Sequence, residues 1–168
     1  FVLDAEAIVA AMNPALSVKM DENRMEALPD RKYHILHADD SVSIRRLVAD
    51  LLKKEGRFDV TQANDGEEAW NLLLRYKQQA EDNNIPISNL VQGIITDIEM
   101  PNLDGLTLCR YIKEDHLLKD IPVAMFSSLI STSLAHKCKS VGADAQFAKP
   151  DLQGISDKMY ELIQANQA

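Results

Sequence analysis

From Tyr33 onward, hydrophobic and polar positions alternate in a regular way. Short apolar runs, typical of strands buried on both faces, are separated by longer segments in which apolar residues recur at helical spacing. The predicted strands cover residues 33–38, 58–63, 91–96, 121–126 and 144–148, and the predicted helices cover residues 42–55, 65–77, 105–114, 131–141 and 152–165. The polar segment 78–89 is predicted to be a loop, longer than most connections between a helix and a strand.

Five strand–helix pairs predict an α/β domain with a parallel sheet, because right-handed crossovers place helices on both faces. A flavodoxin-like, doubly wound sheet with strand order 2-1-3-4-5 fits best, since the chain has no Gly-rich dinucleotide fingerprint. The apolar face of the first helix is expected to consist of Ile44, Leu47, Val48, Leu51 and Leu52.

The composition narrows the classes of partner. The formal charge of the 168-residue chain is −8, which argues against nucleic acid, because phosphate binding needs a basic surface. No apolar run approaches the roughly 20 residues of a membrane-spanning helix, so membrane insertion is not expected. Cys109 and Cys138 are interpreted as packed thiols of a reducing, cytoplasmic compartment.

The first part of the chain differs from the rest. Residues 1–14 have the pattern of a strand end followed by a short amphipathic helix that Pro14 terminates. This piece is too small to bury its own apolar face. Residues 15–32 are interpreted as a linker and residues 33–168 as the domain. Because the sequence begins with Phe1, we expect it to be a fragment of a longer protein.

Candidate chemistry collects at the carboxyl ends of the predicted strands, where open α/β sheets bind their ligands. Asp39 and Asp40 follow the first strand, Asp97 the third, Ser127 the fourth and Lys149 the fifth. The first and third strands flank the point where the strand order reverses. The three carboxylates are therefore expected to converge.

Such convergence needs a compensating positive charge. Two unit charges roughly 4 Å apart repel by about 4 kcal/mol at an effective dielectric constant of about 20. Oxygen ligands with room for water favour Mg²⁺, and Lys149 would add a fixed positive charge. Each residue also has an ordinary explanation: a helix cap for the aspartates, a turn for Ser127 and a strand exit for Lys149. Their occurrence at successive strand ends favours a phosphoryl-transfer site with Asp97 as nucleophile.

Four motif blocks, in this order, resemble the receiver domain of bacterial response regulators: Asp39-Asp40-Ser41, Thr96-Asp97-Ile98-Glu99-Met100-Pro101 with Asp104-Gly105, Phe126-Ser127-Ser128 and Ala148-Lys149-Pro150. The resemblance covers residues 33–168. It implies that a phosphohistidine on a histidine kinase donates a phosphoryl group to Asp97.

The same resemblance implies roles for the other motif residues. Asp40 and Asp97 would bind Mg²⁺ directly, Asp39 would bind it through water, and Glu99 would offer its backbone carbonyl. Lys149 would contact the phosphoryl group. Ser127 occupies the switch position, whose hydroxyl moves toward the phosphate in the family.

One position departs from the family pattern. Receivers commonly have an aromatic residue three positions before the lysine, and this chain has Gln146 there, with Phe147 next. The usual coupling between the aromatic ring and the switch hydroxyl is therefore in doubt. A different mode of partner binding is expected at the face formed by the predicted helix 131–141, strand 144–148 and helix 152–165.

Residues 1–9 resemble the closing segment of a CheW-like coupling domain. A CheW-like domain followed by a linker and a receiver is the layout of CheV-type chemotaxis coupling proteins. This resemblance implies a CheA-like histidine kinase as phosphodonor. It also implies a link to the chemoreceptor array through the missing CheW-like domain.

Several alternatives remain open. The receiver could tune receptor–kinase coupling or act as a phosphate sink, and the sequence does not separate these two. It could also belong to another two-component regulator. An aspartate-nucleophile phosphohydrolase of the haloacid dehalogenase type would need Asp-x-Asp after the first strand, where this chain has Asp39-Asp40. We therefore expect a signalling module whose chemistry is limited to self-catalysed phosphotransfer and slow autodephosphorylation.

Overall fold

The computed structural model describes residues 32–128, 131–149 and 151–167. The expected coupling-domain remnant, residues 1–14, lies outside these ranges, as does the expected linker apart from Lys32. The strands are β1 (Tyr33–Ala38), β2 (Phe58–Ala63), β3 (Gly93–Thr96), β4 (Val123–Ser127) and β5 (Ala145–Ala148). The helices are α1 (Val42–Lys54), α2 (Gly66–Asn83), the short 3₁₀ helix η1 (Ile87–Asn89), α3 (Gly105–Glu114), α4 (Thr132–Ser140) and α5 (Leu152–Gln167).

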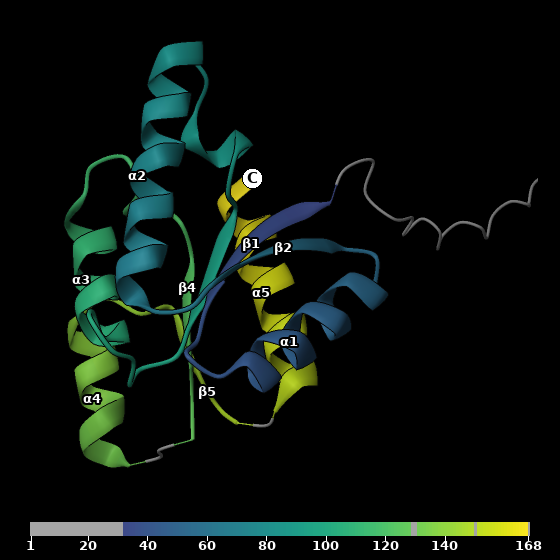
Figure 1. The fold of residues 1–168 in the computed structure, drawn as a ribbon, viewed down its shortest axis with the longest axis vertical. Helices are drawn as coiled ribbons and strands as arrows, with labels where there is room; N and C mark the ends of the chain where they lie inside the picture. The colour runs from purple at the N-terminus through teal and green to yellow at the C-terminus, as the bar shows by residue number, and fades with distance from the viewer. Residues whose placement is uncertain (1–31, 129–130, 150, 168) are drawn as a thin grey trace, which may run out of the picture. The chain divides into compact units, whose positions relative to one another are not determined.

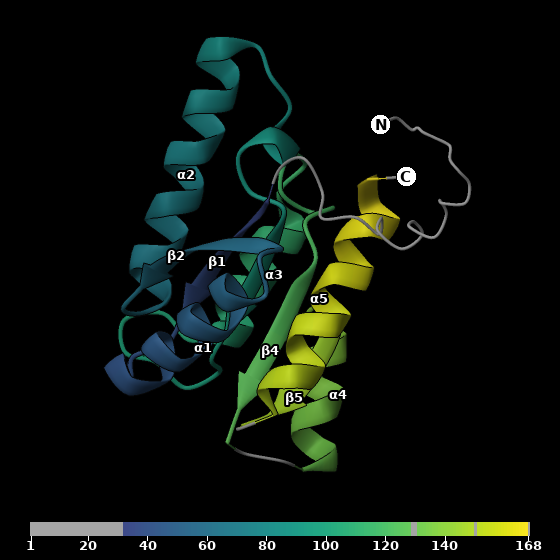
Figure 2. The same cartoon turned by 90° about the vertical axis from the view of Figure 1, so that its right-hand side faces the viewer.

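The five strands form one parallel sheet in the order β2-β1-β3-β4-β5. This order confirms the predicted flavodoxin-like arrangement. Helices α1 and α5 cover one face of the sheet, and α2, α3 and α4 cover the other (Figures 1 and 2). Because β1 and β3 are neighbours although β2 lies between them in sequence, the strand order reverses beside β1.

The core consists of two apolar layers, one on each face of the sheet. Ile94 and Met125 belong to the layer under α2 and α3, whereas Ile95 and Phe126 belong to the layer that contains residues of α1 and α5. All four side chains are fully buried. Successive residues of a strand point to opposite faces, so a strand buried on both faces has a continuous apolar sequence.

Helix α2 is longer than predicted. It continues to Asn83, so the prediction of a loop over residues 78–83 was wrong. Ala80 is buried within this otherwise polar stretch. Asn84 caps the end of the helix: its backbone is left-handed, with φ 52°, and its N–H donates to the carbonyls of Ala80 and Glu81. Asparagine tolerates this conformation better than most residues, which explains the end point.

Helix α1 presents a slightly different face to the core from the one predicted. Leu47, expected in the apolar face, is 50% exposed. Arg45, in contrast, is only 9% exposed and shares the buried face with Val48, Ala49 and Leu52. The buried face is therefore rotated toward Arg45, which lies close to the carboxyl end of β1.

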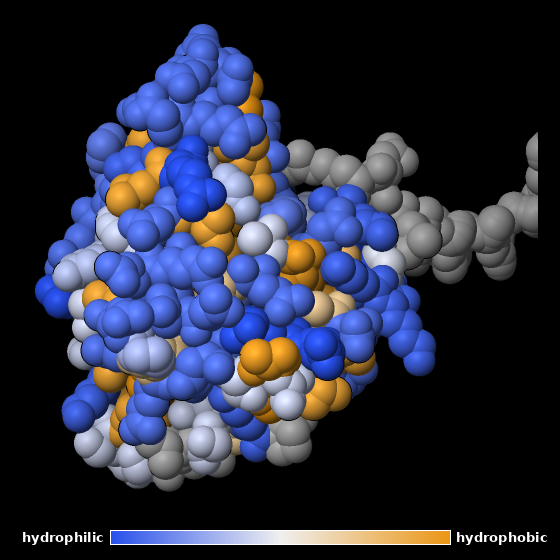
Figure 3. All heavy atoms as spheres, viewed as in Figure 1, coloured by the Kyte–Doolittle hydropathy of each residue, from blue (hydrophilic) through white to orange (hydrophobic). Residues whose placement is uncertain are grey.

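The side of the molecule in Figure 3 is mostly hydrophilic, with small apolar groups scattered over it. The most exposed large apolar side chains in the described ranges are those of Val42, Leu47, Leu74 and Tyr111. No helix in the part of the chain that the structure describes combines the length and apolar character needed to cross a membrane.

Candidate functional site

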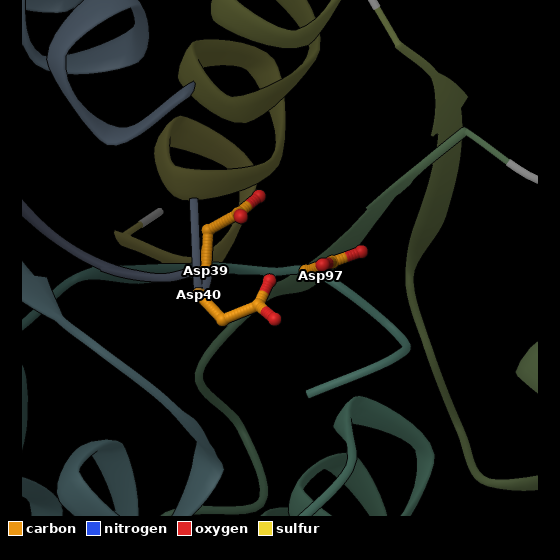
Figure 4. A group of neighbouring side chains, drawn as sticks. All are labelled: Asp39, Asp40 and Asp97. Atoms are coloured by element: carbon orange, nitrogen blue, oxygen red, sulfur yellow. The ribbon is translucent and has the colours of Figure 1, made fainter. Parts of the chain in front are cut away.

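Three aspartates meet at the carboxyl ends of β1 and β3. Asp39 and Asp40 follow β1, Asp97 follows β3, and each offers a carboxylate oxygen within 4.8 Å of the others (Figure 4). The strand register brings them together: Ala38 pairs with Thr96, and the Asp97 N–H donates to the Ala38 carbonyl at 2.8 Å. The next residue of each strand is therefore an acid at the same edge of the sheet.

The first two aspartates have opposite environments. Asp39 is fully buried. Its Oδ1 accepts a hydrogen bond from the Ser41 N–H at 2.9 Å, and its Oδ2 lies 2.8 Å from Lys149 Nζ. Asp40 is exposed. The pair thus offers one carboxylate held by the protein and one that faces solvent.

Asp97 is the central acid of the cluster and is 7% exposed. Its Oδ1 accepts a hydrogen bond from the Ile98 N–H at 2.8 Å and lies 3.5 Å from Lys149 Nζ. Burial, followed by the charge of Asp39, raises the pKa of the Asp97 carboxyl, and Lys149 and the Ile98 N–H oppose this rise. This raised pKa indicates that the surrounding protein does not fully stabilise the negative charge of Asp97.

Lys149 is positioned by the ends of the last two strands. It directly follows β5, and its backbone N–H donates to the Ser127 carbonyl at 2.9 Å. Ser127 is buried and is the last residue of β4, whereas the sequence predicted that this strand ends one residue earlier. Lys149 Nζ also lies 5.7 Å from the centre of the Phe126 ring. Its position between Asp39 and Asp97 makes it the cation of the cluster; Pro150 lies outside the described residues.

The loop between β3 and α3 contains Glu99, which is exposed. Glu99 and Asp40 line an open hollow of about 540 Å³, next to the acidic cluster, with Leu134 and Lys137 of α4 among the other lining residues. The hollow gives the cluster access from solvent.

Glycine is required where this loop turns into α3. The Gly105 N–H donates to the Ile98 carbonyl at 2.8 Å. A Cβ added at Gly105 would lie 1.9 Å from the Asp97 carbonyl oxygen, far closer than atoms can approach. The backbone therefore returns directly under the nucleophile candidate, and the side chain of Asp104 then accepts from the Thr107 N–H to begin α3.

A second contact ties this loop to the start of α2. Asn102, with a left-handed φ of 70°, donates from Nδ2 to Asp65 Oδ2 at 2.7 Å. Asp65 also caps α2, because its Oδ1 accepts from the Glu68 N–H at 2.8 Å. At Gly66 an added Cβ would lie 2.0 Å from the Leu103 carbonyl oxygen. The two loops are therefore in close contact.

Two residues at the base of the site, Arg45 and His37, were not predicted from the sequence. Arg45 Nη1 donates to the Asp39 carbonyl at 2.6 Å. His37 is fully buried, and neither ring nitrogen has a hydrogen-bond partner among the described residues. Burial, followed by the charges of Lys149 and Arg45, lowers the pKa of His37 to about 3, so the ring is neutral near neutral pH. The helical spacing of Arg45 with Val48, Ala49 and Leu52 was the available signal for its burial.

Gln146 lies on β5, where it pairs with Met125 of β4. It lines a hollow of about 350 Å³ together with residues of α4, among them His136 and Cys138. The position at which the resemblance to receiver domains implies an aromatic ring therefore holds a polar side chain, at the boundary of α4 and β5.

The donor set fits a hard divalent cation. Asp39, Asp40 and Asp97 supply only oxygen atoms, and one of them faces solvent, which leaves room for water ligands. Mg²⁺ prefers such sites, with a few carboxylates and several waters. The charge repulsion among the three acids, which Lys149 offsets only in part, would be relieved by a bound cation.

A family model described as "Response regulator receiver domain" matches residues 35–159. The chemotaxis protein CheV3 of Helicobacter pylori is 28% identical over 170 aligned positions, which cover 98% of this chain and 51% of that protein. The CheY homolog of Campylobacter jejuni is 31% identical, over 77% of this chain and 91% of its own length. This chain thus spans about half the length of CheV3 and most of the CheY homolog.

Among solved structures, the "Mn(2+)-bound form of response regulator Rcp1" has a TM-score of 0.59 and 25% identity, and covers 77% of this chain and 91% of that one. That structure contains Mn²⁺, and this chain shares its fold. The family match, the CheY homolog and the parallel sheet agree with one another. The chain belongs to the response regulator receiver domain family, the signalling modules of two-component systems.

Proposed function

We propose that Asp97 accepts a phosphoryl group from a phosphohistidine of a histidine kinase in a Mg²⁺-dependent reaction. The observation that carries this proposal is the convergence of Asp97 with Asp39 and Asp40 within 4.8 Å, with Lys149 Nζ 3.5 Å from Asp97 Oδ1. A nucleophilic carboxylate, an acidic cluster that fits a cation and a fixed ammonium group are the parts that phosphoryl transfer to aspartate needs.

The chemistry of the transfer assigns a role to each side chain. A carboxylate oxygen of Asp97 forms the new O–P bond while the N–P bond of the phosphohistidine breaks, and the electron pair stays on the imidazole nitrogen of the donor. Lys149 stabilises negative charge on the phosphoryl oxygens, and the Ser127 hydroxyl donates a hydrogen bond to one of them. The raised pKa of Asp97 makes its carboxylate more basic and hence a better nucleophile once it is ionised.

We assign Mg²⁺ to the cluster with Asp40 and Asp97 as direct ligands, Asp39 as a ligand through water and the Glu99 backbone carbonyl as a further ligand. The bound ion would neutralise charge on the transferring phosphoryl group. The burial of Asp39 against Lys149 and the exposure of Asp40 support this division between indirect and direct ligands.

A small phosphodonor tests the proposal without a kinase. With acetyl phosphate and Mg²⁺, the intact mass of the chain is expected to increase by one phosphoryl group, and reductive trapping followed by peptide mapping is expected to locate it at Asp97. EDTA should suppress the increase, because the acids then repel the incoming phosphate. A phosphoryl group found on another residue, or an increase insensitive to EDTA, would contradict the proposal.

We further propose that this receiver belongs to a CheV-type chemotaxis coupling protein of a bacterial cytoplasm, in which phosphorylation modulates receptor–kinase coupling. The alignment with CheV3 supports this assignment, since it covers 98% of the chain and extends beyond the receiver match at residues 35–159. Residues 1–14 would then be the end of a CheW-like domain, and residues 15–32 the linker to the receiver at 33–168. Membership in the receiver family argues against the phosphohydrolase alternative.

Kinase preference tests the chemotaxis assignment. Phosphorylated histidine kinases from the source organism, offered one at a time, are expected to transfer to this chain fastest when the donor is the CheA-like kinase. Radiolabel transfer over seconds to minutes measures the preference. A faster transfer from a kinase outside the chemotaxis system would instead favour another two-component regulator.

The phosphate-sink alternative predicts that the CheA-like kinase loses its phosphoryl groups with no change in receptor–kinase coupling.

A further inference from the structure

Arg45 and Arg46 are adjacent arginines of α1 with opposite environments. Arg45 is 9% exposed and belongs to the buried face of the helix, whereas Arg46 is exposed. Arginine is almost never buried without specific partners, because its charge loses the solvation of water. The buried Arg45 therefore needs specific hydrogen-bond partners, which the solvent-exposed Arg46 does not need.

The partners of Arg45 are neutral oxygens at the ends of two strands. Its Nη1 donates to the backbone carbonyl of Asp39 at 2.6 Å, and its Nε donates to Gln62 Oε1 on β2 at 3.2 Å. In the described part of the chain, Arg45 forms no ion pair with a carboxylate. A buried guanidinium that contacts carbonyl oxygens is better placed to orient backbone than to neutralise one acid.

The carbonyl that Arg45 holds belongs to the peptide bond between the two acids of the site. Strand pairing between β1 and β2 ends at Ala38 and Ala63, so the Asp39 carbonyl lies just beyond the ladder. A peptide unit is planar, so fixing its oxygen also fixes the direction from which the Cα of Asp40 continues. Arg45 thus controls the backbone that presents both Asp39 and Asp40.

Two cations, Lys149 and Arg45, contact Asp39. Lys149 contacts the side chains of Asp39 and Asp97 directly, whereas Arg45 reaches the site through the backbone. The two cations approach the acids in different ways and are not interchangeable.

We infer that Arg45 is a positioning residue of the acidic site, which holds the Asp39–Asp40 peptide group so that both carboxylates keep their places beside Asp97. The inference rests on the proposed function, because it takes these carboxylates to be the Mg²⁺ site. Outer partners that orient metal ligands typically change metal affinity by about 10–100-fold when they are removed.

The test compares Arg45→Met, Arg45→Lys and the matched control Arg46→Met in the 168-residue chain. Calorimetric titration with Mg²⁺ alone is expected to give about tenfold or weaker binding for Arg45→Met, a smaller loss for Arg45→Lys, and unchanged binding for Arg46→Met. In the metal-free protein, hydrogen exchange at the Asp40 and Ser41 amides is expected to quicken in Arg45→Met only. Thermal unfolding of each variant is recorded alongside.

A purely structural role would lower the melting temperature of Arg45→Met but leave Mg²⁺ affinity and local exchange at Asp40 unchanged, and that result would overturn the inference. If Arg45→Met does not fold, Arg45→Lys decides, and unchanged affinity in that variant overturns the inference too. If the wild-type protein is phosphorylated at Asp97 but the Arg45 variants bind Mg²⁺ as tightly as the wild type, the inference about Arg45 fails and the proposed function stands. Wild-type protein that binds no Mg²⁺ overturns both.

Discussion

Asp97→Asn is expected to abolish phosphorylation by acetyl phosphate or by a phosphorylated kinase. An amide oxygen carries no formal charge and is a far weaker nucleophile than a carboxylate, while the shape of the side chain stays nearly the same. The variant is also expected to bind Mg²⁺ more weakly, because one of the three acids within 4.8 Å of one another is lost. Intact mass measured after incubation with the phosphodonor and Mg²⁺ reads out the loss.

The same substitution is expected to stabilise the fold. Wild-type Asp97 has a pKa raised above its ordinary value of 3.8, with burial as the first cause and the Asp39 charge as the second. Between the ordinary value and the raised one, the folded state binds more protons than the unfolded state, so stability falls as pH rises through this window. The asparagine variant has no such loss. Its advantage should appear as pH rises above 3.8 and level off above the raised pKa.

Chemical unfolding at several pH values measures this difference. We expect Asp97→Asn to gain on the order of 1 kcal/mol near neutral pH in the absence of Mg²⁺, a fraction of the roughly 4 kcal/mol by which two charges 4 Å apart repel at a dielectric constant of about 20. Asp120→Asn, in an exposed connection, is the matched control and should change neither phosphorylation nor this pH dependence. A destabilised Asp97→Asn would contradict the cost of burial and charge repulsion that we attribute to Asp97 in the acidic cluster.

Lys149→Met is expected to have the next largest effect. The variant loses the ammonium group 2.8 Å from Asp39 and 3.5 Å from Asp97. Removal of one partner from a buried ion pair typically costs about 3–5 kcal/mol, and Asp39 is fully buried. Loss of a group that stabilises charge in a transition state lowers rates by about 10²–10³-fold, so phosphorylation at saturating Mg²⁺ should fall by that factor.

Two comparisons separate these effects of Lys149. Lys158→Met removes a lysine whose side chain is 41% exposed and whose Nζ lies 3.6 Å from Glu161, and it should cost less than about 1 kcal/mol, as is usual for surface pairs. The double variant Asp39→Asn with Lys149→Met removes both charges and should recover part of the lost stability but none of the lost rate. If the double variant is no more stable than Lys149→Met alone, the destabilisation does not come from the charge left on Asp39.

The fold was predictable from the sequence because the central strands β1, β3 and β4 are largely buried on both faces. Runs such as Ile94-Ile95 have no polar side that could be confused with an exposed strand, and each run ends in a polar residue where the sheet meets solvent. The convergence of the acids followed from the strand order, since neighbouring parallel strands end at the same edge. The strand pattern and the strand order therefore made most of the candidate site predictable from the sequence.

The parts that sequence reasoning missed depend on tertiary contacts. Helix α2 was cut short because residues 78–83 are almost entirely polar, and only the burial of Ala80 distinguishes them from a loop. Leu47 was placed in the core because it is apolar, although Arg45 occupies that face instead. The benefit of burying Arg45 comes from the Asp39 carbonyl, a backbone atom of another element, which no side-chain pattern encodes.

The link between Asn102 and Asp65 has a mechanical consequence. Asp65 joins two structures with one carboxylate: one oxygen caps α2 and the other accepts from Asn102 in the loop that contains Glu99. Leu103 also leaves no space for a side chain at Gly66. A shift of the loop beside Asp97 would therefore pull on the first turn of α2. Helix α2 is thus mechanically coupled to the loop beside Asp97, on the side of the domain away from Gln146 and β5.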